Sequence, residues 1–293
     1  MLYIDADERL IVPNIPAFHQ QLADTRNAAL KLRLHPRLGW TAYAELRLFR
    51  NDPRIRFTGE IHERVHPAVN AVCRQDGLDI GLTDAALQHV GYEADQRPKL
   101  ARNIPLLRNY LARDPNRVYC WWHLGEQLHL AGDEPAAREA WENGVKAVRR
   151  QNPADSETSD SMPFSSLIAS RHIAGLPVEA LLEDALQLFP SHYALQWMAG
   201  KHALERGAIA QAHEIFTLLA GVNAETFFDP ELAYDKALFT HTVQESLGLT
   251  AFRAGDFPAA AGHYLQAAAT APDPAPLRIK AALAEAKALR AAE

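Results

Sequence analysis

The chain has 293 residues, 48% of them hydrophobic and 23% charged, a composition typical of a folded globular protein. Its 30 basic residues are outnumbered by 36 acidic ones, and the net charge of -6 argues against a nucleic-acid binder. The start lacks a signal-peptide pattern, no apolar run is as long as a membrane span, and two cysteines give no disulfide framework. We therefore expect a cytoplasmic protein with no transmembrane segment.

The first part of the chain, residues 1–95, shows short patterns typical of β-strands. Leu2–Ile4 is a brief apolar run that ends at acidic residues. Leu30–His35 and Arg54–Phe57 alternate apolar and basic residues, the period-two signature of half-buried strands. Residues 78–92 hold short apolar groups that glycine interrupts, unlike a long helix. These patterns predict an α/β domain.

The remainder, residues 96–293, is predicted to be all-helical, because alanine and leucine recur at helical spacing and no strand pattern is present. Three segments share one pattern. A glycine is followed seven residues later by a turn glycine, five later by an alanine, and four later by an aromatic residue. The three sets are Gly125, Gly132, Ala137 and Trp141; Gly200, Gly207, Ala212 and Phe216; and Gly248, Gly255, Ala260 and Tyr264.

This pattern resembles the tetratricopeptide repeat (TPR), a helix–turn–helix unit of about 34 residues. The small residues would let paired helices approach closely, and the turn glycine would adopt positive φ where the first helix ends. We expect the aromatic residues to fill space against the neighbouring unit. A generic helical bundle is the alternative, but three copies in one register favour the repeat.

Irregular spacing between the copies predicts insertions. The repeat glycines are 75 and 48 residues apart, more than whole repeats require. We expect a degenerate unit at residues 164–190, a polar exposed loop at 149–163 and an insertion at 220–234. Residues 277–293 are predicted to form a capping helix with a charged outer face.

The stretch Gly59–Pro67 has histidines and a glutamate at the spacing of a zinc protease, namely His62, Glu63 and His66. That site needs both histidines on one face of a single helix, and a third ligand downstream. The preceding residues alternate in strand fashion, Pro67 disfavours an α conformation at His66, and no third ligand follows. We predict a strand that ends in a loop, and stoichiometric zinc would be needed to support a peptidase.

Four short motifs occur in an order typical of one enzyme family: "DADE", "RLFR", "F.G.IHE" and "H.GY". Together with the helical repeats they resemble the later part of a bacterial family 2 glycosyltransferase that carries a C-terminal TPR array. The resemblance implies a partial glycosyltransferase A-type, Rossmann-like α/β remnant followed by an all-α TPR solenoid. It also implies inverting, metal-assisted transfer of a sugar from a nucleotide-diphosphate donor to an acceptor hydroxyl. The family's N-terminal nucleotide-binding segment is missing from this sequence, so we expect donor binding to be poor.

The resemblance assigns a metal role to Asp5 and Asp7, with His89 as a further candidate. Carboxylate oxygens suit Mg²⁺ or Mn²⁺, and such an ion would stabilise the leaving diphosphate. On the residues alone, Asp7 could instead cap a helix that begins at Glu8. A lone histidine after an apolar pair could equally be a packed core residue.

The resemblance also places Glu63, with Glu60 as second choice, as the base that takes the acceptor's proton. Loop carboxylates can equally be solvated surface groups. Arg47, Arg50 and His62 are candidate substrate-binding residues for the diphosphate or the sugar. The two arginines could instead be strand-edge charges that face water.

A second interpretation is that the repeats are the working part, an interaction module with a concave groove lined by first helices. The groove-facing positions hold Trp122 and Trp197, with His123, Glu126 and Lys201 nearby. This mixed, partly aromatic surface suits a glycan, peptide or protein. Both tryptophans could instead pack between units.

Overall fold

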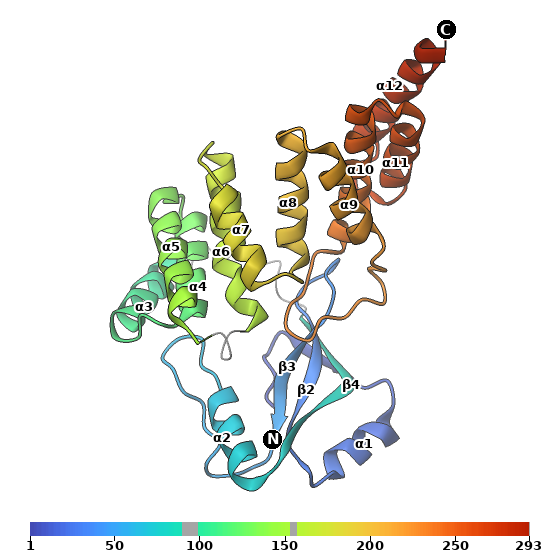
Figure 1. The fold of residues 1–293 in the computed structure, drawn as a ribbon. Coiled ribbons are helices and arrows are strands. Elements are labelled where there is room, and N and C mark those ends of the chain that lie inside the picture. The colour runs from blue at the N-terminus through green and yellow to red at the C-terminus, as the bar shows by residue number, and fades with distance from the viewer. Residues whose placement is uncertain (90–98, 153–156, 293) are drawn as a thin grey trace. The chain divides into compact units, whose positions relative to one another are not determined.

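The computed structural model describes residues 1–89, 99–152 and 157–292, and these divide into two compact units (Figure 1). Unit 1 comprises Met1–Val178 together with Phe228–Ala233, and unit 2 comprises Glu179–Phe227 and Tyr234–Glu293. The predicted domain boundary near residue 95 lies outside the described residues. Within the described ranges, no helix is long and apolar enough to cross a membrane.

Unit 1 begins with a four-stranded sheet in the order β1-β4-β2-β3. Its strands are β1 (Glu8–Ile11), β2 (Asn27–His35), β3 (Tyr43–Phe49) and β4 (Asp79–His89). The β1/β4 and β2/β3 pairs are antiparallel, and β2/β4 is parallel. A Rossmann-like sheet is built from parallel strands with crossover helices, so the expected Rossmann-like remnant is wrong. Period-two patterns identify a strand but carry no information on the direction of its neighbours.

Two helices accompany the sheet, α1 (Ile15–Ala23) and α2 (His66–Asp76). Val69 and Val72 of α2 belong to one buried apolar cluster of the sheet, and Phe18 of α1 packs against a second. Asn14 caps α1 by accepting a hydrogen bond from the Ala17 backbone N–H, as N-cap side chains do. The sequence patterns gave no prediction of either helix.

The strand predictions had mixed outcomes. Leu30–His35 lies within β2, which confirms that prediction, and residues 78–92 contain one continuous strand rather than short pieces. Gly81 suits β4 because a Cβ there would lie 2.7 Å from Leu30 Cδ2 on the adjacent strand. Leu2–Ile4 forms no regular strand, since Leu2 makes only an isolated bridge to Leu48.

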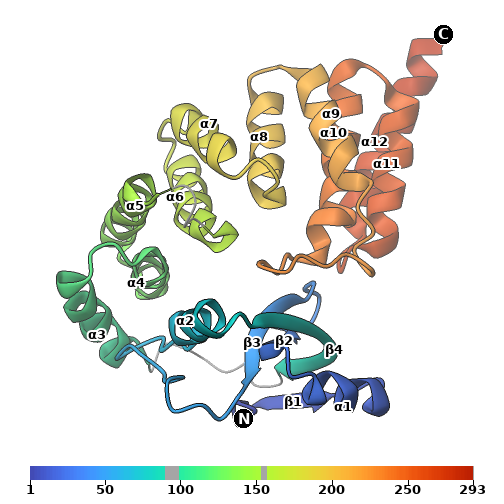
Figure 2. The same cartoon turned by 60° about the horizontal axis from the view of Figure 1, so that its bottom comes forward.

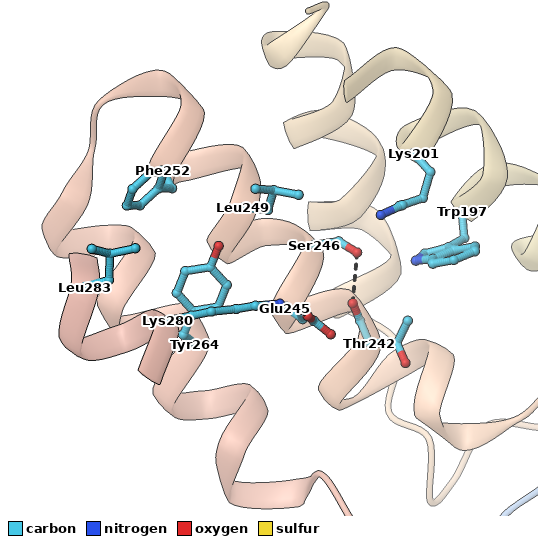
Figure 3. A pocket seen from close by; sticks show the side chains of 10 residues that line it. All are labelled: Trp197, Lys201, Thr242, Glu245, Ser246, Leu249, Phe252, Tyr264, Lys280 and Leu283. Carbon is cyan, nitrogen blue, oxygen red and sulfur yellow. Dashed lines mark hydrogen bonds and ion pairs between the residues drawn. The ribbon is translucent and has the colours of Figure 1, made fainter. Parts of the chain in front are cut away.

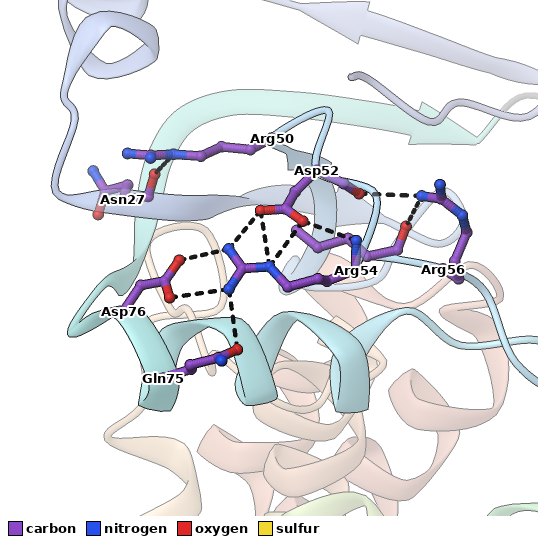
Figure 4. A network of polar contacts seen from close by, with 8 residues as sticks. Asn27, Arg50, Asp52, Arg54, Arg56, Gln75 and Asp76 are labelled. Atoms are coloured by element: carbon purple, nitrogen blue, oxygen red, sulfur yellow. Dashed lines mark hydrogen bonds and ion pairs between the residues drawn. The ribbon is translucent and has the colours of Figure 1, made fainter.

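The predicted strand Arg54–Phe57 is wrong, because its arginines hold an irregular loop (Figure 4). Arg54 binds the carboxylates of Asp52 and Asp76, and Arg56 donates to backbone carbonyls of the same loop. Arg56 thus satisfies backbone carbonyls that a strand would have paired with its neighbour, and Arg54 ties the loop to α2 through Asp76. The alternation of basic and apolar residues does not distinguish these two arrangements.

The rest of the described chain is helical, which confirms the prediction for the second part. Unit 1 continues with α3 (Leu100–Arg113), α4 (Val118–Leu130), α5 (Glu134–Arg150) and α6 (Met162–Ile173). Unit 2 contains α7 (Glu179–Leu188), α8 (Tyr193–Glu205), α9 (Ile209–Ala220), α10 (His241–Ala254), α11 (Phe257–Thr270) and α12 (Ala275–Ala292). Figure 2 shows α8 to α12 lying side by side.

The three predicted repeats are the helix pairs α4/α5, α8/α9 and α10/α11. Their turn glycines have φ values of 83°, 79° and 83°, a left-handed conformation that favours glycine. Gly125, Gly200 and Gly248 each face the aromatic ring of their own pair, and an added Cβ would meet that ring at 2.1, 2.6 and 2.7 Å. The close approach is confirmed. Each ring fills the space over the glycine of its own pair. Tyr264 also shares a buried cluster with Leu277 and Ala281 of the following helix, α12, as expected for packing against the neighbouring unit.

The insertions behave differently from one another. Residues 153–156 of the predicted polar loop lie outside the described residues, but a 3₁₀ turn at Thr158–Ser161 follows and buries Ser161. The insertion at 220–234 connects α9 to α10, and its Phe228–Ala233 portion belongs to unit 1.

The closing helix α12 packs through Leu277, Ala281 and Ala284. Its outer face is not purely charged, because it also exposes three large apolar side chains, Ile279, Leu283 and Leu289.

Candidate functional site: a groove on the first helices of unit 2

A groove with a volume of about 330 Å³ lies along α8, α10 and α12 of unit 2 (Figure 3). Helices α8 and α10 are the first helices of their repeats, and α12 follows the last pair. The lining residues are Trp197, Lys201, Thr242, Glu245, Ser246, Leu249, Phe252, Tyr264, Lys280 and Leu283. The turn that ends each first helix fixes which face it presents, so the repeat register places these side chains together.

One side of the groove is formed by Trp197 and Lys201 on α8, one helical turn apart. The Lys201 Nζ lies 5.9 Å from the centroid of the Trp197 ring, within cation–π range. The Trp197 Nε1 is buried without a hydrogen-bond partner. Among the described residues, Lys201 has no carboxylate within ion-pair distance.

The opposite side carries a compensated charge. Lys280 of α12 donates from Nζ to Glu245 Oε1 of α10. Closer to Trp197, Ser246 Oγ donates to the Thr242 backbone carbonyl at 2.9 Å (Figure 3). The lining therefore contains two ammonium groups and one carboxylate, and Lys201 holds the excess positive charge.

The remaining lining residues are apolar or aromatic. Leu249 and Phe252 come from α10, and Leu283 of α12 is 53% exposed. Tyr264, which fills the space over Gly248, borders the same region, and burial raises the pKa of its phenol. The groove thus joins a cationic, indole-bearing side to an apolar side.

Trp122, the equivalent of Trp197 in the first repeat, has a different environment. Its Nε1 donates to Ser166 Oγ at 3.2 Å, and Ser166 Oγ donates in turn to Glu126 Oε1 at 2.8 Å. Burial raises the pKa of the Glu126 carboxyl. Trp122 is therefore engaged by α6, whereas the Trp197 indole N–H is not engaged by the fold.

A loop of unit 1 covers the neighbouring face of α4. Thr58 and Arg64 close this loop through two backbone hydrogen bonds of 3.0 and 2.9 Å. His62 at its tip has a φ of 52° and stacks on His123, with 4.0 Å between ring centroids. Burial lowers the pKa of both imidazoles. The Glu60 carboxylate forms two hydrogen bonds with Arg113, at 2.8 and 2.6 Å.

This loop geometry bears on the zinc-protease motif. His62 lies in the loop, and α2 begins only at His66, so the two histidines do not share one helix. Pro67 did not prevent a helix at His66, because proline is tolerated in the first turn. Glu63 is exposed in the loop, and Glu60 is paired with Arg113, which lowers the pKa of its carboxyl.

The predicted metal ligands precede or end strands of the sheet, but they do not form one donor set. Asp5 accepts from the Tyr3 hydroxyl at 3.0 Å and pairs with Arg47 at 3.5 Å. Asp7 Oδ2 lies 3.4 Å from His89 Nε2. No group of three or more His, Cys, Asp or Glu side chains within the described residues is arranged to hold a metal ion. This arrangement does not fit Mg²⁺ or Mn²⁺, which need several oxygen ligands.

The two predicted substrate-binding arginines have partners within the fold. Arg47 is buried and donates to the buried Glu8 carboxylate at 2.8 Å. Arg50 donates to the backbone carbonyls of Asn27 and Thr25. Because Glu8 begins β1, the alternative in which Asp7 caps a helix at Glu8 is also wrong.

Comparisons with known proteins agree with the repeat architecture. A TPR repeat-containing protein of Synechococcus elongatus is 33% identical over 156 residues, which is 51% of this chain and 39% of that protein. The chain thus spans about two fifths of that relative's length. No family model matches.

Solved structures with similar helices were also found. The Cut9–Hcn1 complex of the APC/C has a TM-score of 0.48 at 16% identity, covering 64% of this chain and 33% of that one. The C-terminal part of a TPR repeat-containing protein of Cytophaga hutchinsonii has a TM-score of 0.44 at 12% identity, covering 65% and 68%. Yeast Tom70 has a TM-score of 0.33 at 12% identity, covering 64% and 43%.

The glycosyltransferase assignment is therefore wrong. The curated relative is described by its repeats, no glycosyltransferase family model matches, and the sheet is not Rossmann-like. The four motifs that suggested the family are short, and the residues within them serve structural pairs such as Arg47–Glu8. The interaction-module interpretation agrees better with these findings.

The sequence patterns missed most of the groove. Leu249, Glu245, Lys280 and Leu283 were not singled out. Glu245 lies three residues before its repeat glycine, as Trp197 does. The repeat register could therefore have predicted that Glu245 faces the groove. Lys280 and Leu283 are three apart on one helix and share a face, but only the packing of α12 shows which face it is.

Proposed function

We propose that this chain is a protein-interaction module whose groove in unit 2 binds a peptide segment of a partner protein. The observation that carries the proposal is the set of side chains on α8, α10 and α12, which combines an unpaired ammonium, a partly exposed indole and exposed leucine in one concavity. Recognition sites of this kind typically join apolar pockets to a few placed polar groups.

The repeat architecture supports this proposal. Stacked helix pairs produce extended surfaces lined by their first helices, and such surfaces are the usual binding face of repeat proteins. Apart from Tyr264, the groove residues are not part of the glycine–aromatic contact between paired helices. The relative from Synechococcus elongatus, described as a TPR repeat-containing protein, is consistent with an interaction role.

We also propose that the module works in the cytoplasm. Cys73 and Cys120 are both free, as thiols are in a reducing compartment.

The test is selection of binders from a library of random peptides displayed on phage, using the full 293-residue chain. Affinities of the enriched peptides would then be measured for the wild type, for Trp197→Ala and for Leu283→Ser. Leu218→Ser is the matched control, because Leu218 is 72% exposed on α9 and does not line the groove.

We expect the groove variants to lose binding while Leu218→Ser retains it, with far-UV circular dichroism showing that all three remain folded. Failure to enrich any peptide, or equal binding by the folded groove variants and the wild type, would reject the proposal.

A further inference from the structure

We infer that the groove selects an acidic peptide segment, in which a carboxylate side chain pairs with Lys201 and an adjacent aromatic or aliphatic side chain contacts the apolar side. This inference rests on the proposed function and names the ligand class. Its basis is the charge of the lining and the way in which the chain's own loop occupies the equivalent face of unit 1.

The charge balance of the groove favours an anionic ligand. Lys280 is compensated by Glu245, but Lys201 has no acidic partner among the described residues. The chain as a whole carries a net charge of -6, so the excess positive charge of the groove lining is opposite in sign to the charge of the whole protein. Opposite charges across an interface increase both the association rate and the specificity of binding.

The apolar side defines the second requirement. Leu249, Phe252 and Leu283 border the groove, and Leu283 remains 53% exposed. A ligand side chain that covers this surface removes apolar area from water, worth about 25 cal/mol per Å². A carboxylate alone would satisfy Lys201 but leave this side uncovered, so the ligand needs both groups.

The loop at Glu60–His62 of unit 1 places a planar ring on a repeat face, with a carboxylate beside it that pairs with the preceding helix, α3. Its carboxylate pairs with Arg113, and its ring stacks on His123 and contacts Tyr119 edge-on at 5.4 Å. Tyr119 and His123 lie six and two residues before the repeat glycine of α4.

The corresponding positions in the third repeat, again six and two residues before the glycine, are Thr242 and Ser246 of α10. Both residues line the groove of unit 2. The loop tip therefore covers in the first repeat the helix face that is left open in the third. A planar side chain is thus an occupant that this repeat face already accepts in the first repeat, with an acidic residue beside it.

The test uses the displayed peptide library against the wild type and three variants: Lys201→Ala, Lys201→Glu and Lys287→Glu. Lys287 is an exposed lysine of α12 outside the groove lining, so its variant makes the same charge change elsewhere on unit 2. One enriched peptide would also be synthesised in a matched form, with each Glu or Asp replaced by Gln or Asn.

We expect enrichment of peptides with Asp or Glu beside an aromatic or aliphatic residue. Lys201→Ala should weaken their binding by about tenfold, the loss of one charge-assisted contact. Lys201→Glu should abolish it and select peptides with Lys or Arg instead, whereas Lys287→Glu should leave affinity within about twofold.

Four outcomes separate the claims. Enrichment of neutral or basic peptides by the wild type, or equal binding of the acidic and amide peptides, overturns the inference but leaves a peptide-binding groove. Unchanged acidic-peptide binding by Lys201→Glu also overturns it. If no peptide is enriched at all, the proposed function itself fails.

Discussion

The close approach of the repeat helices can be tested at Gly248 and Gly262, two glycines in the helices of one pair. Gly248 in α10 lies against the buried ring of Tyr264, whereas Gly262 in α11 has no atom within 4 Å of an added Cβ. Replacing each by alanine makes the same chemical change. Both substitutions should gain about 1 kcal/mol from the higher helix propensity of alanine.

The steric term then distinguishes the two variants. At Gly248 the new Cβ would lie 2.7 Å from Tyr264 Cδ1 and Cε1, and the ring is only 4% exposed. Moving it to an ordinary contact distance requires a displacement on the order of 1 Å within a packed cluster. Overpacking of this kind costs about 1–3 kcal/mol, so Gly248→Ala should be neutral to about 2 kcal/mol destabilising. Gly262→Ala should be stabilising.

The assay is native-state hydrogen exchange of the α10 and α11 amides, which reports local opening even if the two units unfold separately. Tyr264→Leu removes the ring atoms that clash, so its combination with Gly248→Ala should show a favourable coupling energy. Equal protection in Gly248→Ala and Gly262→Ala would refute the claim that the glycine–aromatic contact sets the helix spacing.

Three further predictions concern single residues. Burial lowers the pKa of His192 to about 4, so the folded state binds its proton less readily than the unfolded state. The contribution of His192 to the free energy of unfolding should be complete above about pH 6.5 and should fall by about 3 kcal/mol as the pH drops to 4. When unfolding is measured as a function of pH, the His192→Asn variant should lose less stability over this range. Arg47→Ala leaves the buried Glu8 carboxylate without its pair, and thermal denaturation should show a free energy of unfolding lower by about 3 kcal/mol. Arg50 is exposed, so Arg50→Ala should lower it by less than about 1 kcal/mol. Gly207→Ala places a side chain at φ 79°, a left-handed conformation that strains alanine. It should lower the free energy of opening of α8 and α9 by about 1–2 kcal/mol, as measured by hydrogen exchange of their amides.

The helical repeats were predictable because their signals are local and recur in register. Each repeat glycine, turn glycine and aromatic residue has a fixed offset, and the structure uses each one in the same way. The N-terminal part offered no such redundancy. Strand order, the direction of β4 and the role of Arg54 depend on partners far along the chain, so short alternating patterns could not determine them.

The candidate site was predictable only in part for a related reason. Trp122 and Trp197 occupy the same position of the repeat, and the sequence gives no reason to separate them. Their difference arises from Ser166, which accepts the Trp122 indole N–H, while the fold provides no acceptor to Trp197. Residues outside the repeat pattern thus give equivalent positions different hydrogen-bond partners.

This difference also explains why binding should be confined to one part of the repeat array. In unit 1, the face of α4 is covered by the His62 loop and Trp122 is hydrogen-bonded, so an incoming peptide would have to displace contacts already made. In unit 2, the corresponding face of α10 lines an open groove, and Lys201 brings an unpaired charge. A ligand that binds to groups already paired must first break those contacts, whereas an unpaired charge and exposed apolar surface carry no such cost. The same repeat pattern therefore yields a covered surface in one unit and, in the function that we propose, a recognition surface in the other.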